Sequence, residues 1–282
     1  MKIIGVVGAG VMGTGVAQNL AQAGYQVILV DRTTEILEHS REDIYQNVRL
    51  QTLFRKSNEV VYDPDTIISQ IYFTTDYQQL KEVGFLIENV TENWDIKVKV
   101  YREIDSICGS DCIFAVNTSC VPITRIAALT KRPSKVIGTH FMNPVPLKTT
   151  VETIRGYYTS EETIEATKEL LASMGKECIV VNDYPGFVSN RISHLFMNEA
   201  AFVVQDQVAT AQEVDDIFKK CYGHKMGPLE TADLIGLDTV VNSLDVLYEN
   251  YQDPKFRCCP LLRKMVDAGL FGKKSGQGFY TY

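Results

Sequence analysis

The chain has 282 residues, of which 45% are hydrophobic and 22% are charged, and its formal net charge is −7. This composition predicts a globular protein of one large or two ordinary domains, with ample apolar material for a core. The acidic balance argues against a binder of nucleic acid or of an anionic membrane, because such proteins need a basic surface. No apolar run reaches about 18 residues, so we expect no transmembrane helix.

The seven cysteines are scattered along the chain, and their odd number favours free thiols. Cys108 and Cys112 have a spacing that could serve a metal. Neither a second pair nor a nearby histidine would complete four ligands, so we predict no metal site. The apolar N-terminus could belong to a signal peptide, but we interpret it as a first strand and expect a cytoplasmic protein.

A glycine-rich pattern follows the first apolar run, residues 2–7, which we predict to be a buried parallel strand. The next residues have GxGxxG order and open a helical pattern; they are Gly8, Gly10, Val11, Met12 and Gly13. In such a loop the first glycine makes a tight turn, the second lets the backbone approach a pyrophosphate, and the third lets helix and strand pack closely. The free amides of the helix N-terminus favour the anion, so the sequence predicts a dinucleotide site.

A second apolar run ends at Asp31, 18 residues after Gly13. Its carboxylate would accept hydrogen bonds from the adenosine ribose and repel a 2′-phosphate, which favours NAD over NADP. Arg32 follows directly, and an arginine at this position can serve a phosphate. We therefore predict NAD, with NADP as the alternative that Arg32 leaves open.

The predicted elements alternate between helix and strand as far as residue 181. In chain order they are a helical stretch at 33–70, strands at 71–77 and 84–90, a helix at 94–108, a strand at 112–119, a short helix at 123–129, strands at 135–141 and 150–156, and a helix and a strand within 163–181. This alternation predicts an α/β fold with a Rossmann-type, doubly wound parallel sheet flanked by helices.

The pattern changes at residues 182–192, after which we find helical periodicity and no convincing strand. A long amphipathic helix is predicted at 189–206, and a second begins after Thr210, which is a plausible N-cap. We therefore predict a dinucleotide-binding domain over residues 1–184 and an all-helical domain over residues 185–282.

Residues 138–146, GTHFMNPVP, place one of the four histidines, His140, before two prolines. A proline has no amide donor and disfavours helical geometry in the residue before it, so we expect His140 on a loop that leaves a strand. An imidazole at this position has two interpretations, a catalytic base or a packed ring.

Several ordered stretches together resemble the 3-hydroxyacyl-CoA dehydrogenase family, which includes 3-hydroxybutyryl-CoA dehydrogenases. The stretches span nearly the whole chain and are GVVGAGVMGTGVAQ, VNTSCVPIT, RPSKVIGTHFMNPVP, VETIRG, YPGFVSNRI, GPLETADLIGLD and GQGFYTY. The resemblance implies an N-terminal NAD-binding domain that carries the catalytic residues. It also implies a C-terminal helical domain for dimerisation and substrate binding, and oxidation of a 3-hydroxyacyl thioester.

The resemblance also implies the catalytic residues. The family's catalytic histidine falls on His140 and its partner glutamate on Glu152, while the serine of the NTS motif falls on Ser119 and the asparagine of PGFxxNR on Asn190. Hydride transfer from an alcohol leaves a hydroxyl proton that a neutral imidazole can accept. The glutamate would fix the tautomer of the ring and stabilise the imidazolium. Ser119 and Asn190 would hydrogen-bond the substrate and orient it.

Further residues are assigned to the cofactor and the substrate. The resemblance places Glu92 close to both, and Asn117 beside the expected nicotinamide. The candidate cofactor contacts are therefore the glycine-loop residues with Asp31, Arg32, Glu92 and Asn117. Besides Ser119 and Asn190, the candidate substrate contacts are Asn143, Lys148, Arg55 and Lys56.

Two departures from the family pattern leave the substrate open. Lys148, Thr149 and Thr150 make the stretch before the glutamate more polar than usual, which indicates a short or polar acyl end unless the lysine points to solvent. Only Arg55 and Lys56 stand where members that bind coenzyme A usually have a lysine-rich turn. An acyl carrier protein bearing a small group such as glyceryl, as in polyketide extender-unit assembly, is therefore an alternative to coenzyme A.

Two further classes of function are alternatives: a dehydrogenase of free hydroxy acids or sugar acids, and a non-catalytic NAD-binding sensor or scaffold. A binding module has no need of a paired imidazole and carboxylate, which argues against the sensor. The expected partners are an acyl thioester and a second copy of the chain, with neither nucleic acid nor membrane.

Overall fold

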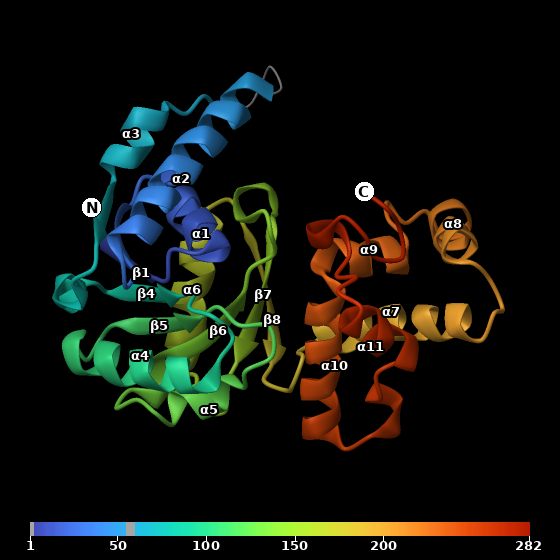
Figure 1. The fold of residues 1–282 in the computed structure, drawn as a ribbon. Coiled ribbons are helices and arrows are strands. Elements are labelled where there is room, and N and C mark those ends of the chain that lie inside the picture. The colour runs from blue at the N-terminus through green and yellow to red at the C-terminus, as the bar shows by residue number, and fades with distance from the viewer. Residues whose placement is uncertain (1–2, 55–59) are drawn as a thin grey trace. The chain divides into compact units, whose positions relative to one another are not determined.

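The computed structural model describes residues 3–54 and 60–282 and divides the chain into two compact units, Met1–Asp183 and Tyr184–Tyr282. Figure 1 shows strands and helices in the first unit and helices in the second. The predicted fold class, a doubly wound sheet with a second helical domain, is confirmed. No helix among the described residues combines the length and the apolar character that a bilayer span requires.

One eight-stranded sheet organises the described part of the first unit, in the order β3-β2-β1-β4-β5-β6-β7-β8. Its strands are β1 Ile3–Val7, β2 Gln26–Val30, β3 Ile71–Thr74, β4 Phe85–Glu88, β5 Ile113–Val116, β6 Val136–His140, β7 Thr150–Arg155 and β8 Glu177–Asn182. Neighbouring strands run parallel except β6 and β7, which pair antiparallel. The sheet is thus mostly parallel, with one reversal that the sequence-based prediction did not include.

Helices cover both faces of this sheet. They are α1 Val11–Gln22, α2 Thr34–Phe54, α3 Pro64–Ser69, α4 Trp94–Ile107, α5 Ile123–Ala127 and α6 Glu161–Ser173, with short 3₁₀ turns η1 Tyr77–Glu82, η2 Pro133–Lys135 and η3 Val145–Leu147. Apolar side chains of α1, α2 and α6 share one buried core with the sheet. Figure 1 shows α4 and α5 on the opposite face. Both faces are therefore buried, which explains the continuous apolar runs of the inner strands.

The strand order explains where a site can form. The chain moves outward from β1 to β2 and β3 and then returns to β4 on the other side of β1. The carboxyl ends of these parallel strands meet at one edge, and ligands of such sheets bind in the crevice where the order reverses. Gly8 follows β1, Asp31 follows β2, Asn89 follows β4 and Asn117 follows β5.

The second unit is helical, as predicted. Its helices are α7 Ser189–Gln205, α8 Ala211–Tyr222, α9 Pro228–Ile235, α10 Leu237–Tyr251 and α11 Pro260–Asp267, with the 3₁₀ turns η4 Pro254–Phe256 and η5 Lys273–Ser275. The predicted N-cap of α8 is confirmed, because Thr210 accepts the amide of Glu213 while the Glu213 carboxylate accepts the amide of Thr210. Buried Asp233 accepts the amides of Phe279 and Tyr280 and thereby fastens the C-terminal segment.

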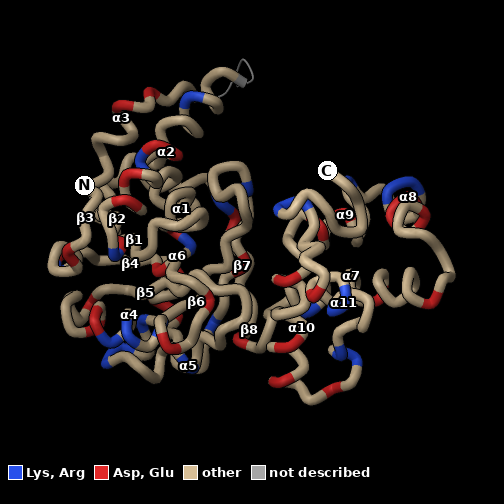
Figure 2. The backbone as a smooth tube through the Cα atoms, in the orientation of Figure 1, with Lys and Arg blue, Asp and Glu red and all other residues tan. Residues whose placement is uncertain are grey.

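All seven cysteines are free thiols, as predicted. Charged residues of both signs occur on the same helices, as α4 and α8 show in Figure 2. On α8, Lys219 and Lys220 both lie within ion-pair distance of Asp216. Helices with charges of both signs are ordinary solvated surfaces.

Candidate active site

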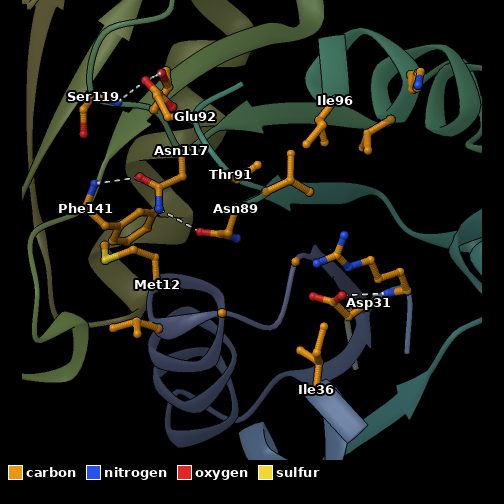
Figure 3. A pocket seen from close by; sticks show the side chains of 18 of the residues that line it. Met12, Asp31, Ile36, Asn89, Thr91, Glu92, Ile96, Asn117, Ser119 and Phe141 are labelled. Atoms are coloured by element: carbon orange, nitrogen blue, oxygen red, sulfur yellow. Dashed lines mark hydrogen bonds between the residues drawn. The ribbon is translucent and has the colours of Figure 1, made fainter. Parts of the chain in front are cut away.

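A cavity of about 680 Å³ opens in the first unit at the carboxyl ends of the parallel strands. This volume is typical of a ligand site, for which about 300–1,000 Å³ is usual. Figure 3 shows Asp31 and Ile36 at one end and Ser119 and Phe141 at the other, with the glycine loop between them. The lining residues are Gly8, Gly10, Val11, Met12, Asp31, Arg32, Ile36, Tyr77, Asn89, Val90, Thr91, Glu92, Ile96, Lys99, Val100, Asn117, Thr118, Ser119, His140 and Phe141.

The glycine loop leaves room in front of α1. Gly8 has a φ of +93°, and a Cβ there would lie 2.8 Å from the carbonyl carbon of Asn89. A Cβ on Gly13 would overlap the carbonyl oxygen of Gly8. At Gly10, the N-cap of α1, no described atom lies within 4 Å of the Cβ position, and no side chain caps the helix. An open helix N-terminus beside backbone that approaches closely fits a dinucleotide pyrophosphate.

Asp31, directly after β2, lies beside the glycine loop, and backbone amides fix the position of its carboxylate. One oxygen accepts the amide of Ala9 at 2.6 Å and the other accepts the amide of Arg32 at 2.7 Å. Tyr77 lines the same cavity, and burial raises the pKa of Tyr77 to about 12. This end therefore presents a carboxylate acceptor and, at neutral pH, a phenol that keeps its proton.

His140 and Glu152 face each other across two strands. They are direct partners in the antiparallel register of β6 and β7, so both side chains leave the same face of the sheet. The Nδ1 atom of His140 lies 3.0 Å from the Oε2 atom of Glu152, and its Nε2 atom lies 3.2 Å from the Oγ atom of Ser119. His140 is only 6% exposed yet lines the cavity.

This arrangement fixes the tautomer of the imidazole. An ionised carboxylate can only accept a hydrogen bond, so Nδ1 of His140 carries the proton that Glu152 accepts. In the neutral ring Nε2 then has the lone pair, and it faces the hydroxyl of Ser119. The ring can take one proton at Nε2 while Glu152 stabilises the resulting charge.

The loop that carries Ser119 is held by Glu92. One carboxylate oxygen of Glu92 accepts the amides of Ser119 at 3.0 Å and Cys120 at 2.9 Å, and the hydroxyl of Thr118 at 2.5 Å. The other oxygen lies 3.9 Å from the ammonium of Lys97. Glu92 thus orders the turn from which Ser119 reaches His140.

Asn117 links the ends of three strands, β4, β5 and β6, at the cavity. Its amide nitrogen donates to Oδ1 of Asn89 at 2.7 Å, and its Oδ1 atom accepts the amide of Phe141 at 3.2 Å. Figure 3 shows this chain of side chains beside Met12. The residue after His140 is therefore tied to the ends of β4 and β5.

Sequence reasoning missed a buried ion pair below this site. The ammonium of Lys97 lies 2.9 Å from both carboxylate oxygens of Glu88, and both side chains are fully buried. Burial raises the pKa of Glu88, while the charge of Lys97 opposes that rise. A signal was present, because Lys97 lies three and four residues before the buried Val100 and Tyr101, on the inner face of α4.

Other predicted residues lie elsewhere. Asn143 and Lys148 are exposed on the connection between β6 and β7, apart from the described residues that line the cavity. Arg55 and Lys56 lie outside the described residues. Asn190 belongs to the first turn of α7 in the second unit.

Comparison with known proteins agrees with this architecture. The family model for the NAD-binding domain of 3-hydroxyacyl-CoA dehydrogenase matches residues 3–184, and the model for the C-terminal domain of the same family matches residues 186–282. A probable 3-hydroxybutyryl-CoA dehydrogenase of Deinococcus radiodurans is 44% identical over 278 residues, which is 99% of each chain. One of Bacillus subtilis is 43% identical over 100% of this chain and 98% of its own.

A solved structure is similar over the same length. The crystal structure of (S)-3-hydroxybutyryl-CoA dehydrogenase from Ralstonia eutropha has a TM-score of 0.95 and 40% identity, covering 100% of this chain and 99% of its own. The sequence resemblance is thereby confirmed. The chain belongs to the 3-hydroxyacyl-CoA dehydrogenase family and is an NAD-dependent oxidoreductase of that family.

Proposed function

We propose that the chain interconverts a 3-hydroxyacyl thioester and the corresponding 3-oxoacyl thioester, with 3-hydroxybutyryl-CoA as the substrate. The observation that carries the proposal is the hydrogen-bonded series Ser119, His140 and Glu152, of which Ser119 and His140 line the same cavity as the glycine loop. The substrate follows from the relatives, which are named as 3-hydroxybutyryl-CoA dehydrogenases.

In the direction of oxidation, the proton and the hydride leave the substrate to different acceptors. NAD, when bound along the glycine loop, supplies the nicotinamide carbon that accepts the hydride from C3. Nε2 of His140 accepts the hydroxyl proton as the carbon–oxygen double bond forms, and the carboxylate of Glu152 stabilises the imidazolium. In the reverse direction the imidazolium returns that proton to the oxygen.

The remaining candidates orient the reactants. Ser119 would share its hydroxyl between Nε2 and the substrate oxygen, which keeps the reacting proton on line with the ring. Asn117, held by Asn89 and Phe141, would support the nicotinamide end, and Asp31 the adenosine ribose. Asn190 is assigned to the acyl group by the family resemblance alone.

The proposal includes a homodimer formed through the second unit. This unit exposes several large apolar side chains, which a single copy would leave in water: Val188, Ile192, Ile217 and Leu234. A thioester on an acyl carrier protein remains the alternative substrate. An assay with coenzyme A thioesters and with carrier-protein thioesters distinguishes the two.

The test is His140→Gln assayed by loss of NADH absorbance with acetoacetyl-CoA. Removing the base is expected to lower kcat by about 10²–10⁴-fold. NADH affinity should be retained, and energy transfer from Trp94, the single tryptophan, to the bound dinucleotide measures it. His39→Gln on the exposed face of α2 is the matched control.

Two outcomes would refute the assignment. Equal turnover by the wild type and His140→Gln would remove His140 from the chemistry. A wild type that binds NADH but reduces neither acetoacetyl-CoA nor small oxoacyl groups on a carrier protein would favour the non-catalytic sensor. Turnover on the carrier-bound groups alone would identify the carrier-protein substrate.

A further inference from the structure

We propose that Lys176 is a positioning residue, whose buried ammonium holds the turn between the strand of His140 and the strand of Glu152. The inference rests on the proposed function, since it gives this turn a part in the proton transfer. Lys176 is not one of the residues that line the cavity. It acts through its hydrogen bonds to backbone carbonyls of the turn.

Lys176 lies between α6 and β8 and reaches across to η3. Gly175, with a φ of +71°, ends the turn after α6, and Lys176 is only 5% exposed. Its Nζ atom donates to the carbonyl oxygen of Val145 at 2.7 Å and to that of Lys148 at 2.6 Å. These two carbonyls lie at the first residue of η3 and at the residue directly after it.

The turn that Lys176 holds connects the two strands of the proposed catalytic pair. β6 ends at His140, β7 begins at Thr150, and the register places His140 opposite Glu152. On its other side the turn packs on α1, where a Cβ on Gly15 would lie 3.0 Å from the Cβ of Val145. The turn is therefore held between α1 on one side and the ammonium of Lys176 on the other.

The chemistry of this contact is unusual for a core. The acceptors of the ammonium are carbonyl oxygens rather than carboxylates, and burial lowers the pKa of Lys176 to about 8. Burying a cation costs free energy that two charge-assisted hydrogen bonds offset only in part. An apolar side chain would avoid that cost but would leave both carbonyls without these donors. The geometry points to a role for the ammonium in fixing the position of the turn.

Displacement of the turn would reach the proton-transfer pair directly. The connection between the strands begins directly after His140 and ends three residues before Glu152. The Nδ1 atom of His140 lies 3.0 Å from the carboxylate of Glu152. A misplacement of about 1 Å can lower a rate by about 10²-fold. A longer separation would also weaken the hydrogen bond from Nδ1 of His140 to Glu152, which stabilises the imidazolium.

The experiment compares Lys176→Met with Lys168→Met, a control on the exposed face of α6. Lys176→Met is expected to lower kcat by about 10-fold to 100-fold. By NMR, the Nδ1 proton of His140, which its hydrogen bond to Glu152 protects from exchange, should exchange faster than in the wild type. Loss of this signal in His140→Gln gives the assignment. Lys176→Arg, which restores donors, should recover part of both effects.

The outcomes separate positioning from mere stability. A folded Lys176→Met with an unchanged exchange rate of the His140 Nδ1 proton, or with kcat reduced only in proportion to the folded fraction, would overturn the inference. If Lys176→Met does not fold, Lys176→Gln replaces it, because its uncharged amide on a shorter side chain cannot reach both carbonyls; it must show the same faster exchange of the His140 Nδ1 proton. The NMR readout needs no turnover, so a wild type without dehydrogenase activity would refute the proposed function without removing the test of Lys176.

Discussion

Two carboxylates of the cavity owe their positions to backbone amides. Asp31 accepts the amides of Ala9 and Arg32, and Glu92 accepts those of Ser119 and Cys120. Hydrogen bonds from amides to an ionised group are among the stronger ones, and the backbone that donates them is already fixed by the fold. Acceptors at both ends of the site are thus in place before a ligand arrives.

Asp31 is predicted to decide the choice between the two dinucleotides. Asp31→Ser removes the charge that opposes a 2′-phosphate and one strong acceptor for the ribose. NADH affinity should fall about tenfold, the effect of one charge-assisted hydrogen bond of roughly 1.5 kcal/mol, while NADPH affinity should rise or stay constant. Energy transfer from Trp94 to each dinucleotide measures both affinities.

The matched control for this prediction is Asp43→Ser on the surface of α2, which should leave both affinities unchanged. A parallel loss of NADH and NADPH binding in Asp31→Ser would contradict the specific role. It would mean that the carboxylate serves only to order the glycine loop through the amide of Ala9.

At the scale of elements, α4 is fastened to the sheet by a buried charge. Glu88 is the last residue of β4, and Lys97 reaches it from the inner face of α4. Breaking one side of a buried ion pair is strongly destabilising, because the remaining charge has no partner. The pair therefore holds the segment between them, which contains Glu92, close to the end of β4.

Lys97→Met is predicted to lower the free energy of unfolding by about 3–5 kcal/mol near neutral pH. Burial already raises the pKa of Glu88 above 4.5, and loss of Lys97 removes the charge that opposes this rise. Between 4.5 and the raised pKa, the folded state binds the proton and the unfolded state does not, so stability falls as pH rises. The loss of unfolding free energy in Lys97→Met should therefore be smaller near pH 5 than near pH 8.

Urea unfolding at those two pH values measures this dependence, with the exposed Lys81→Met as control. The double variant Glu88→Leu with Lys97→Met removes both charges and should recover much of the stability. A deficit that is equal at both pH values would show that Glu88 does not gain a proton when its partner is lost.

For the whole molecule, the second unit is predicted to join two copies of the chain. Sedimentation equilibrium should give twice the chain mass of 31.7 kDa at micromolar concentrations. The physical reason is the apolar surface that the second unit exposes, which association would remove from water. A monomer mass throughout the concentration range would contradict the proposed dimer.

The direction of β7 is where the fold departs from its prediction. The alternation of apolar residues reveals that residues 150–156 form a strand but carries no information on its direction. A signal was available in the chain length, because a parallel crossover needs about a dozen residues or more and residues 141–149 are fewer. The reversal also makes His140 and Glu152 direct cross-strand partners.

The sequence by itself determined the order of strands and helices, the glycine loop, the family and the identity of the candidate site residues. These are local properties, because periodicity and motif spacing depend on residues that are close together in the sequence. Only the tertiary structure decided the register that brings His140 to Glu152, the burial of Lys97 against Glu88, and the reach of Lys176 to the turn at Val145. Each of these depends on which side chains from different elements meet in a low-dielectric interior. The helical periodicity around Lys97 indicated its inner face but not its partner.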